Sequence, residues 1–135
     1  MAFELHPRLA ADTVPVCEFA ASSLLLMNDA RYPWCVVVPR VPDVRELHAL
    51  PDGVRETVFA EVMRVAAGLE ALTGATKMNV AALGNMVPQL HVHVIARNAD
   101  DAAWPGPVWG VGQAEPYAAA ALDDLLQRLR SRFGG

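Results

Sequence analysis

The strongest constraint on the fold is a change of hydrophobic period in the middle of the chain. Between Asp52 and Leu72, valine and leucine recur every three or four residues, a pattern typical of a helix with one buried face. The stripe consists of Val54, Val58, Val62, Val65, Leu69 and Leu72. Asp52 can cap the start of this helix, and Thr73-Gly74 can end it. The sequence therefore predicts a central helix of about five turns.

Strand-like segments stand on both sides of this helix. They are expected at residues 19–28, 34–40, 77–83 and 89–95, where β-branched and other apolar residues are bounded by turn residues. A short helix is expected at residues 44–50, and a second amphipathic helix at residues 117–133. This order predicts a single antiparallel α+β domain over residues 1–135, closed by the last helix.

Composition limits the partners. The formal net charge is −4, Lys77 is the only lysine and the ten arginines are scattered, so no basic patch for duplex nucleic acid is expected. Hydrophobic residues make up 53% of the chain. No apolar run is long enough to span a membrane. Excess apolar content in a small chain favours a buried subunit interface.

The two cysteines and the N-terminal sequence bear on localisation. Cys17 and Cys35 are too few for a disulfide scaffold and lack the spacing of metal ligands. The N-terminal sequence lacks the basic start and long apolar centre of a signal peptide. A cytoplasmic protein with reduced thiols is expected.

The residues most able to take part in a reaction lie at positions 87–97, which read VPQLHVHVIAR. Side chains alternate between the two faces of a strand, so Gln89, His91 and His93 are expected on one face, about 6.5 to 7 Å apart. Leu90, Val92 and Val94 would face the core. Burying the polar row without partners would be costly, so it is interpreted as the lining of a pocket. An exposed sheet face that carries titratable residues by chance is the alternative.

A metal site is a third possibility, because two histidines separated by one residue also begin the metal sites of cupin barrels. Such a site needs a nearby glutamate and a distant third histidine. After His93 the chain continues VIARNADD, without a glutamate, and two long helices do not fit that barrel. No metal and no cofactor are therefore expected.

The same stretch resembles the signature of the histidine triad (HIT) family, in which three histidines alternate with apolar residues. Gln89 takes the place of the first histidine, His91 of the second and His93 of the third. The resemblance extends over roughly residues 15–97, through the strand before Asn28, the central helix and the glycine turn before the motif. It implies a HIT-like antiparallel sheet of about five strands with a central and a C-terminal helix.

The resemblance also implies an activity. HIT enzymes cleave at the α-phosphorus of nucleotides such as nucleoside phosphoramidates or dinucleoside polyphosphates, through a nucleotidyl-histidine intermediate. Carried over, His91 is the nucleophile and His93 donates a hydrogen bond to phosphate oxygens, while Gln89 can position groups but cannot titrate. The family also pairs into homodimers through the central helix and an adjoining strand.

Three departures from the family pattern keep a second function open. Besides Gln89, Met86 stands where the family has a serine or threonine that assists the leaving group, and Trp34 stands where many members have a further histidine. A HIT-like nucleotide-binding protein with little or no turnover is the alternative that these changes suggest.

The nucleotide-binding candidates follow from the same resemblance. Asn28 matches the residue that holds the ribose, one of Leu26 and Met27 would face the base, and Asn85 could bind phosphate. Each has a structural alternative: Asn28 and Asn85 in turns, the other two in the core. Further along the chain, Arg97 could contact phosphate or solvent, and Trp104 and Trp109 could form a pocket wall or a subunit contact.

Overall fold

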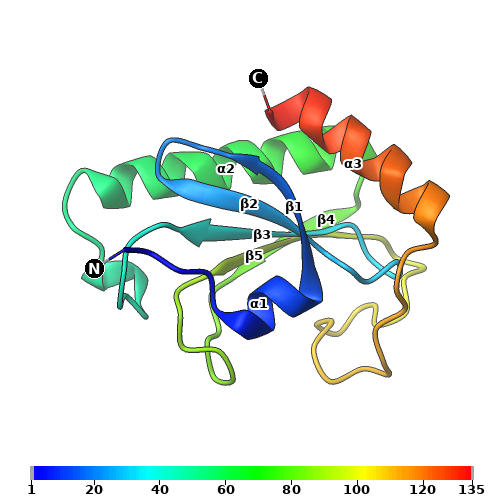
Figure 1. Cartoon of the computed structure of the whole chain (residues 1–135). Coiled ribbons are helices and arrows are strands. Elements are labelled where there is room, and N and C mark those ends of the chain that lie inside the picture. Colours follow the sequence, from blue (N-terminus) through cyan, green and yellow to red (C-terminus); the bar gives the residue numbers. More distant parts are fainter. Residues whose placement is uncertain (1, 135) are drawn as a thin grey trace.

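The computed structural model describes residues 2–134 as a sheet covered by helices on one side and by α1 and a long loop on the other (Figure 1). The sheet has five strands in the order β1-β2-β3-β5-β4, and every neighbouring pair is antiparallel. The strands are β1 (Thr13–Glu18), β2 (Ser22–Met27), β3 (Trp34–Pro39), β4 (Lys77–Ala81) and β5 (Val92–Arg97). The expected fold class is thus confirmed.

Within residues 2–134 the α-helices are α1 (Pro7–Asp12), α2 (Val54–Thr73) and α3 (Ala119–Phe133). The helix α2 begins after Gly53, whose N–H donates to the Glu56 carboxylate. Asp52 instead pairs with Arg55 at 3.0 Å, so its expected capping role was wrong. At the other end Gly74 adopts a φ of 66°, a left-handed conformation that glycine reaches without strain.

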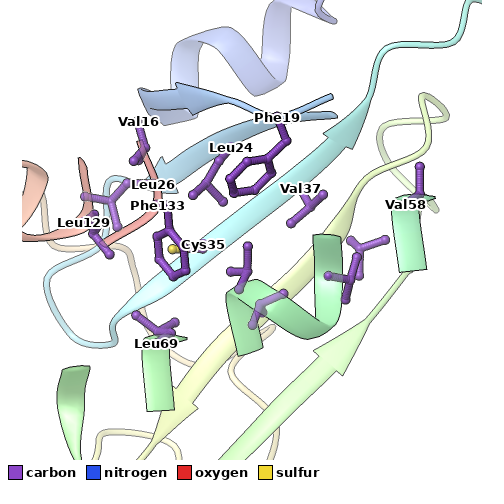
Figure 2. Close-up of a cluster of buried hydrophobic side chains, with 14 of the residues drawn as sticks. Val16, Phe19, Leu24, Leu26, Cys35, Val37, Val58, Leu69, Leu129 and Phe133 are labelled. Atoms are coloured by element: carbon purple, nitrogen blue, oxygen red, sulfur yellow. The ribbon is translucent and has the colours of Figure 1, made fainter. Parts of the chain in front are cut away.

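One face of the sheet packs against α2 and α3. The predicted stripe of α2 supplies buried residues such as Val58 and Leu69, which meet Leu24 and Val37 from the sheet (Figure 2). Phe133 of α3 closes this core edge-on against Phe19, with ring centroids 6.3 Å apart. Burial of this apolar surface is the main stabilising contribution expected for the fold.

The opposite face of the sheet carries a second cluster, under α1 and the loop that leads to α3. It includes Leu9 of α1, Trp34 and Val36 of β3, Ile95 of β5 and Val108 of the loop. His93 pairs with Val36 across β5 and β3, so its side chain lies on this face. The histidines are therefore separated from α2 by the sheet.

Several element boundaries differ from those expected. The strand expected at residues 89–95 begins only at Val92, and the helix expected at residues 44–50 is a 3-10 turn, Leu47–Ala49. Neither α1 nor β1 was predicted. Proline at position 15 removes a backbone donor, and β1 carries a register shift between Pro15 and Cys17, as is tolerated in an edge strand.

Arg97, the last residue of β5, was expected to contact phosphate or solvent, and that was wrong. It is 2% exposed and donates to both carboxylate oxygens of Asp101, at 2.7 and 2.9 Å. It also donates to Asn79 and to the carbonyl of Gly106. Arg97 thus anchors the loop that follows β5. Across residues 2–134, no helix has the length and apolar character that crossing a membrane requires.

Candidate active site

A pocket of about 420 Å³ opens on the face of the sheet opposite α2. Both motif histidines line it, together with residues of α1, of the turn before the motif and of the loop before α3. Met27 of β2 and Trp34 of β3 also line it. Besides the two histidines, the lining residues are Arg8, Leu9, Asp12, Met27, Trp34, Leu83, Gly84, Asn85, Met86, Val87 and Trp109. The two histidines, which sequence reasoning placed in a pocket, are thus brought together in one.

His91 lies just before β5 and is 6% exposed. Its Nδ1 is 2.7 Å from the main-chain carbonyl oxygen of Gln89. A carbonyl can only accept, so Nδ1 carries the hydrogen of the neutral ring and Nε2 keeps its lone pair. Such a hydrogen bond leaves the lone pair of His91 Nε2 free to interact with another group.

His93 is held by a different partner. Its Nδ1 accepts a hydrogen bond from Nε1 of Trp34 at 3.0 Å, and its ring centroid is 4.9 Å from that of His91. Burial, and then the neighbouring His91, lower the pKa of His93 from 6.5 to about 4. The ring is therefore neutral near pH 7.

Gln89 does not share the pocket with the histidines. Its Oε1 accepts the N–H of His6 and its Nε2 donates to the carbonyl of Glu4, each at 2.8 Å. The side chain lies in a separate hollow with His6, Asp43 and Arg45. The expectation that Gln89 lies on the face of His91 and His93 was wrong, because alternation holds only within a strand and β5 has not begun at residue 89.

A family model described as the HIT domain matches residues 8–100. The chain belongs to the HIT domain family. A solved histidine triad protein from Marinobacter aquaeolei is 44% identical, with 99% of this chain and 98% of that chain covered and a TM-score of 0.97. One from Bradyrhizobium japonicum is 43% identical, with 98% of both chains covered and a TM-score of 0.96. No curated protein matches this sequence.

The nucleotide-binding candidates of this HIT domain are divided among three places. Met27 and Asn85 line the histidine pocket. Asn28 lines an adjoining hollow of about 560 Å³, to which Met27 and Trp34 also belong, and its Oδ1 accepts the N–H of Tyr117 at 2.9 Å. Leu26 is 1% exposed within the core under α2 and α3. Its inclusion in the site was therefore wrong, since adjacent strand residues point to opposite faces.

Sequence reasoning missed the contribution of α1 to the pocket. Arg8 and Asp12 line it and form an exposed ion pair at 3.1 Å, while Leu9 packs beneath. A weak signal was available in Pro7, because proline is common at the first helical position. In the structure, His6 precedes it and its side chain accepts the N–H of Arg8.

The tryptophans of the loop take different positions. Trp109 lies in the pocket, with its ring centroid 5.1 Å from that of His93. The guanidinium of Arg97 is 5.8 Å from the ring centroid of Trp104. Of the two open interpretations, a pocket wall therefore applies to Trp109.

Across residues 2–134, no group of three or more histidine, cysteine, aspartate or glutamate side chains is arranged to hold a metal ion. Nδ1 of His91 is hydrogen-bonded to the Gln89 carbonyl, and Nδ1 of His93 is hydrogen-bonded to Trp34.

Proposed function

We propose that this protein is a nucleotide hydrolase or nucleotidyltransferase that acts at the α-phosphorus, through a nucleotidyl-histidine formed on His91. Membership of the HIT family supports the substrate class. The observation that carries the proposal is the hydrogen bond from Nδ1 of His91 to the Gln89 carbonyl, because it directs the lone pair of Nε2 away from the backbone. A neutral imidazole held in this way is a competent nucleophile near pH 7.

In the first step, the lone pair of His91 Nε2 forms a bond to the α-phosphorus while the bond to the leaving group breaks. The leaving group departs with the bonding pair, and an amine then takes its proton from water. In the second step water attacks the phosphorus, the N–P bond breaks and its electron pair returns to His91 Nε2. The attacking water gives up a proton to solvent, and the nucleoside monophosphate is released. His93 acts by donating from Nε2 to a phosphoryl oxygen whose charge grows in each transition state.

The nucleotide-binding roles are proposed from position. Met27 would contact the base and Asn85 would donate to a phosphate oxygen, since both line the pocket. Asn28 would hold the ribose through Nδ2, because its Oδ1 is occupied by the N–H of Tyr117. Gln89 would be a positioning residue, acting through its carbonyl on His91.

The charge of the pocket lining favours a nucleoside phosphoramidate over a dinucleoside polyphosphate. Among the described residues that line the pocket, Arg8 is the only one with a permanent positive charge, and Asp12 pairs with it. A dinucleoside polyphosphate carries several negative charges that would need cationic partners. A nucleoside phosphoramidate therefore suits this pocket better and is the substrate to assay first.

The alternative is a HIT-like nucleotide-binding protein with little turnover. It is favoured by Met86, which is 80% exposed at the rim of the pocket and can neither donate nor accept a proton there. Binding of AMP without any cleavage of a phosphoramidate would support this alternative.

The test is the release of AMP from an adenosine phosphoramidate in the presence of a chelator, which also tests the expected independence from metal. We expect His91→Ala to lower kcat by more than about a thousandfold, since it removes the nucleophile. The matched control is His48→Ala, because His48 is exposed and lies outside the pocket. Turnover by His91→Ala at the wild-type rate would refute the assignment.

The proposal also includes a homodimer, a single domain and a cytoplasmic location. Cys17 and Cys35 are both free thiols, which suits a reducing compartment. The dimer is supported by the exposed side chains of Phe59 and Met63 on α2, 45% and 53% exposed, and by the edge strand β4, which pairs with β5 on one side only.

A further inference from the structure

Trp34 stands where many HIT members have a histidine, and its contact gives it a role in the site. It is the first residue of β3 and pairs with Ile95, while His93 pairs with Val36. Trp34 and His93 are therefore diagonal neighbours on one face of the sheet. The indole N–H reaches Nδ1 of His93 at 3.0 Å.

In this hydrogen bond Trp34 must be the donor and His93 the acceptor. An indole N–H can donate but cannot accept, so the atom that it meets must present a lone pair. Nδ1 of His93 therefore carries no hydrogen, and the single hydrogen of the neutral ring lies on Nε2. Within residues 2–134, the bond from Trp34 is the only side-chain hydrogen bond of His93.

We propose that Trp34 is a positioning residue that fixes His93 in the tautomer with its hydrogen on Nε2, so that His93 is a neutral hydrogen-bond donor and not a proton carrier. The tautomer follows from the contact alone. Its use on a phosphoryl oxygen rests on the proposed function. The replacement of histidine by tryptophan thus adds a fixed donor, where the sequence alone suggested a loss of support.

The surroundings keep this arrangement in place. Trp34 is 7% exposed and meets Tyr32 and Trp109 edge-on, with ring centroids 6.3 and 6.0 Å away. Trp109 also packs edge-on against His93 at 5.1 Å. The indole therefore has little freedom to turn its N–H elsewhere.

Protonation of His93 is opposed on several sides. A hydrogen added to Nδ1 would point at the indole N–H and remove the hydrogen bond. The other titratable groups that line the pocket are His91, Arg8 and Asp12, of which the last two pair with each other. The lowered pKa of His93, caused first by burial and then by His91, agrees with a ring that stays neutral.

The test is the protonation pattern of the His93 ring nitrogens, measured by long-range ¹H–¹⁵N NMR on the ligand-free protein at pH 7. We expect wild type to show a hydrogen on Nε2 alone. Trp34→Phe keeps an aromatic ring but removes the donor, and we expect the tautomer ratio to move at least about fivefold towards Nδ1–H. Trp109→Phe is the matched control, because Trp109 touches the same ring without a hydrogen bond, and its tautomer ratio should equal that of wild type.

A hydrogen on Nδ1 in wild type, or an unchanged ratio in Trp34→Phe, would overturn the proposal. An equal change in Trp34→Phe and Trp109→Phe would also overturn it, since packing and not the hydrogen bond would then set the tautomer. With a phosphoramidate, Trp34→Phe should lower kcat about three- to tenfold with little change in KM. A wild-type protein with no turnover would refute the proposed function but would leave the tautomer result standing.

Discussion

Gln89 contributes to the site through two separate groups. Its carbonyl orients His91, a contact that any residue at this position could make. Its side-chain amide bridges Glu4 and His6, just before α1, which forms part of the pocket wall. The side chain of Gln89 therefore acts on the pocket by holding the N-terminal segment in place.

This arrangement predicts the effects of substitution at Gln89. Gln89→His should change kcat by less than about tenfold, or 1.4 kcal/mol in barrier, because the carbonyl remains. Gln89→Ala should cost about 1–2 kcal/mol of folding stability through two lost hydrogen bonds. Gln89→Glu should be no better, since a carboxylate can accept from His6 but cannot donate to the carbonyl of Glu4.

Urea unfolding measures the loss of folding stability, and amide exchange of residues 4–10 measures the loosening of the N-terminal segment. His48→Ala is the control for both. Faster exchange of the N-terminal segment in Gln89→Ala is the expected sign of a lost tether. A gain of several orders of magnitude in turnover for Gln89→His would contradict this account. It would mean that the natural protein is a weakened enzyme and would favour the nucleotide-binding alternative.

The residue scale also shows what the sequence could decide. Alternation placed His93 on the face opposite the core correctly, because it lies within β5. It failed for Gln89, which precedes the strand, and it could not choose between Leu26 and Met27 without knowing which face of β2 meets the helices. The partner of Trp34 was equally out of reach, since it depends on the register between β3 and β5.

At the scale of elements, a buried ion pair anchors the first part of the loop from Asn98 to Ala118. Arg97 and Asp101 are 2% and 7% exposed at their side chains. Asp101 also accepts the N–H groups of Asn98, Ala103 and Trp104. Hydrogen bonds from Arg97 lower the pKa of Asp101 to about 2. This loop carries Trp109 to the pocket, so the pair supports the site indirectly.

We expect Arg97→Ala to destabilise the fold by about 3 kcal/mol, because it leaves the Asp101 carboxylate buried without its cation. Arg128→Ala, which removes an exposed arginine of α3, should change stability by less than about 0.5 kcal/mol. Chemical denaturation of both variants at pH 7 measures the difference. Equal stability of the two variants would show that the ion pair does not anchor the loop.

Helices and strands with a long periodic hydrophobic pattern could be predicted from the sequence, and short ones could not. The stripe of α2 repeats over the whole helix and was predicted almost to the residue. α1 has six residues and β1 contains Pro15, so neither has a periodic signal of useful length. The buried state of Arg97 was not predictable, because Asn79 and Gly106 come from separate segments that only the fold brings to it.

At the scale of the whole molecule, the exposed face of α2 predicts assembly. From the sequence, Thr57, Ala60, Glu61, Arg64 and Gly68 are expected on the faces of this helix outside the apolar stripe, where small residues would permit close approach of a partner. For Glu61, Arg64 and Gly68 the structure shows contacts within the chain instead. Glu61 accepts the N–H of Ala21, Arg64 donates to the carbonyl of Phe133, and a side chain on Gly68 would meet Phe133 at 2.5 Å. These residues serve the protein's own α3 and the turn between β1 and β2.

The proposed dimer therefore depends on Phe59 and Met63. Charged side chains at these positions would have to be buried without partners, so the double variant Phe59→Lys, Met63→Lys should be monomeric. Light scattering at tens of micromolar should show a dimer for wild type and for Asp124→Lys, which changes an exposed residue of α3. A wild-type monomer would refute the dimer.

The pKa of His93 also predicts how stability depends on pH. The folded value of about 4 lies below the ordinary 6.5, so between these values the unfolded chain binds a proton that the folded chain does not. Stability attributable to this group is complete above pH 6.5 and falls as the pH drops towards 4. At pH 4.5 the loss is roughly 2–3 kcal/mol.

His93→Gln removes this titration but keeps an oxygen that can accept from Trp34. Between pH 7 and 4.5, the free energy of unfolding should fall less in this variant than in wild type. The difference between the two losses should be roughly 2–3 kcal/mol. Urea denaturation at both pH values measures this double difference. Parallel losses in the two proteins would show that His93 is not held neutral by the fold.

The central claim is that His91 forms a covalent bond to the nucleotide. Mass spectrometry of wild-type protein, mixed with an adenosine phosphoramidate and quickly denatured at neutral to alkaline pH, tests it directly. The account predicts an adenylyl group on the peptide that contains His91, located on that histidine by fragmentation and absent in His91→Ala. AMP release with the adenylyl group on another residue, or with His91→Ala equally active, would contradict it.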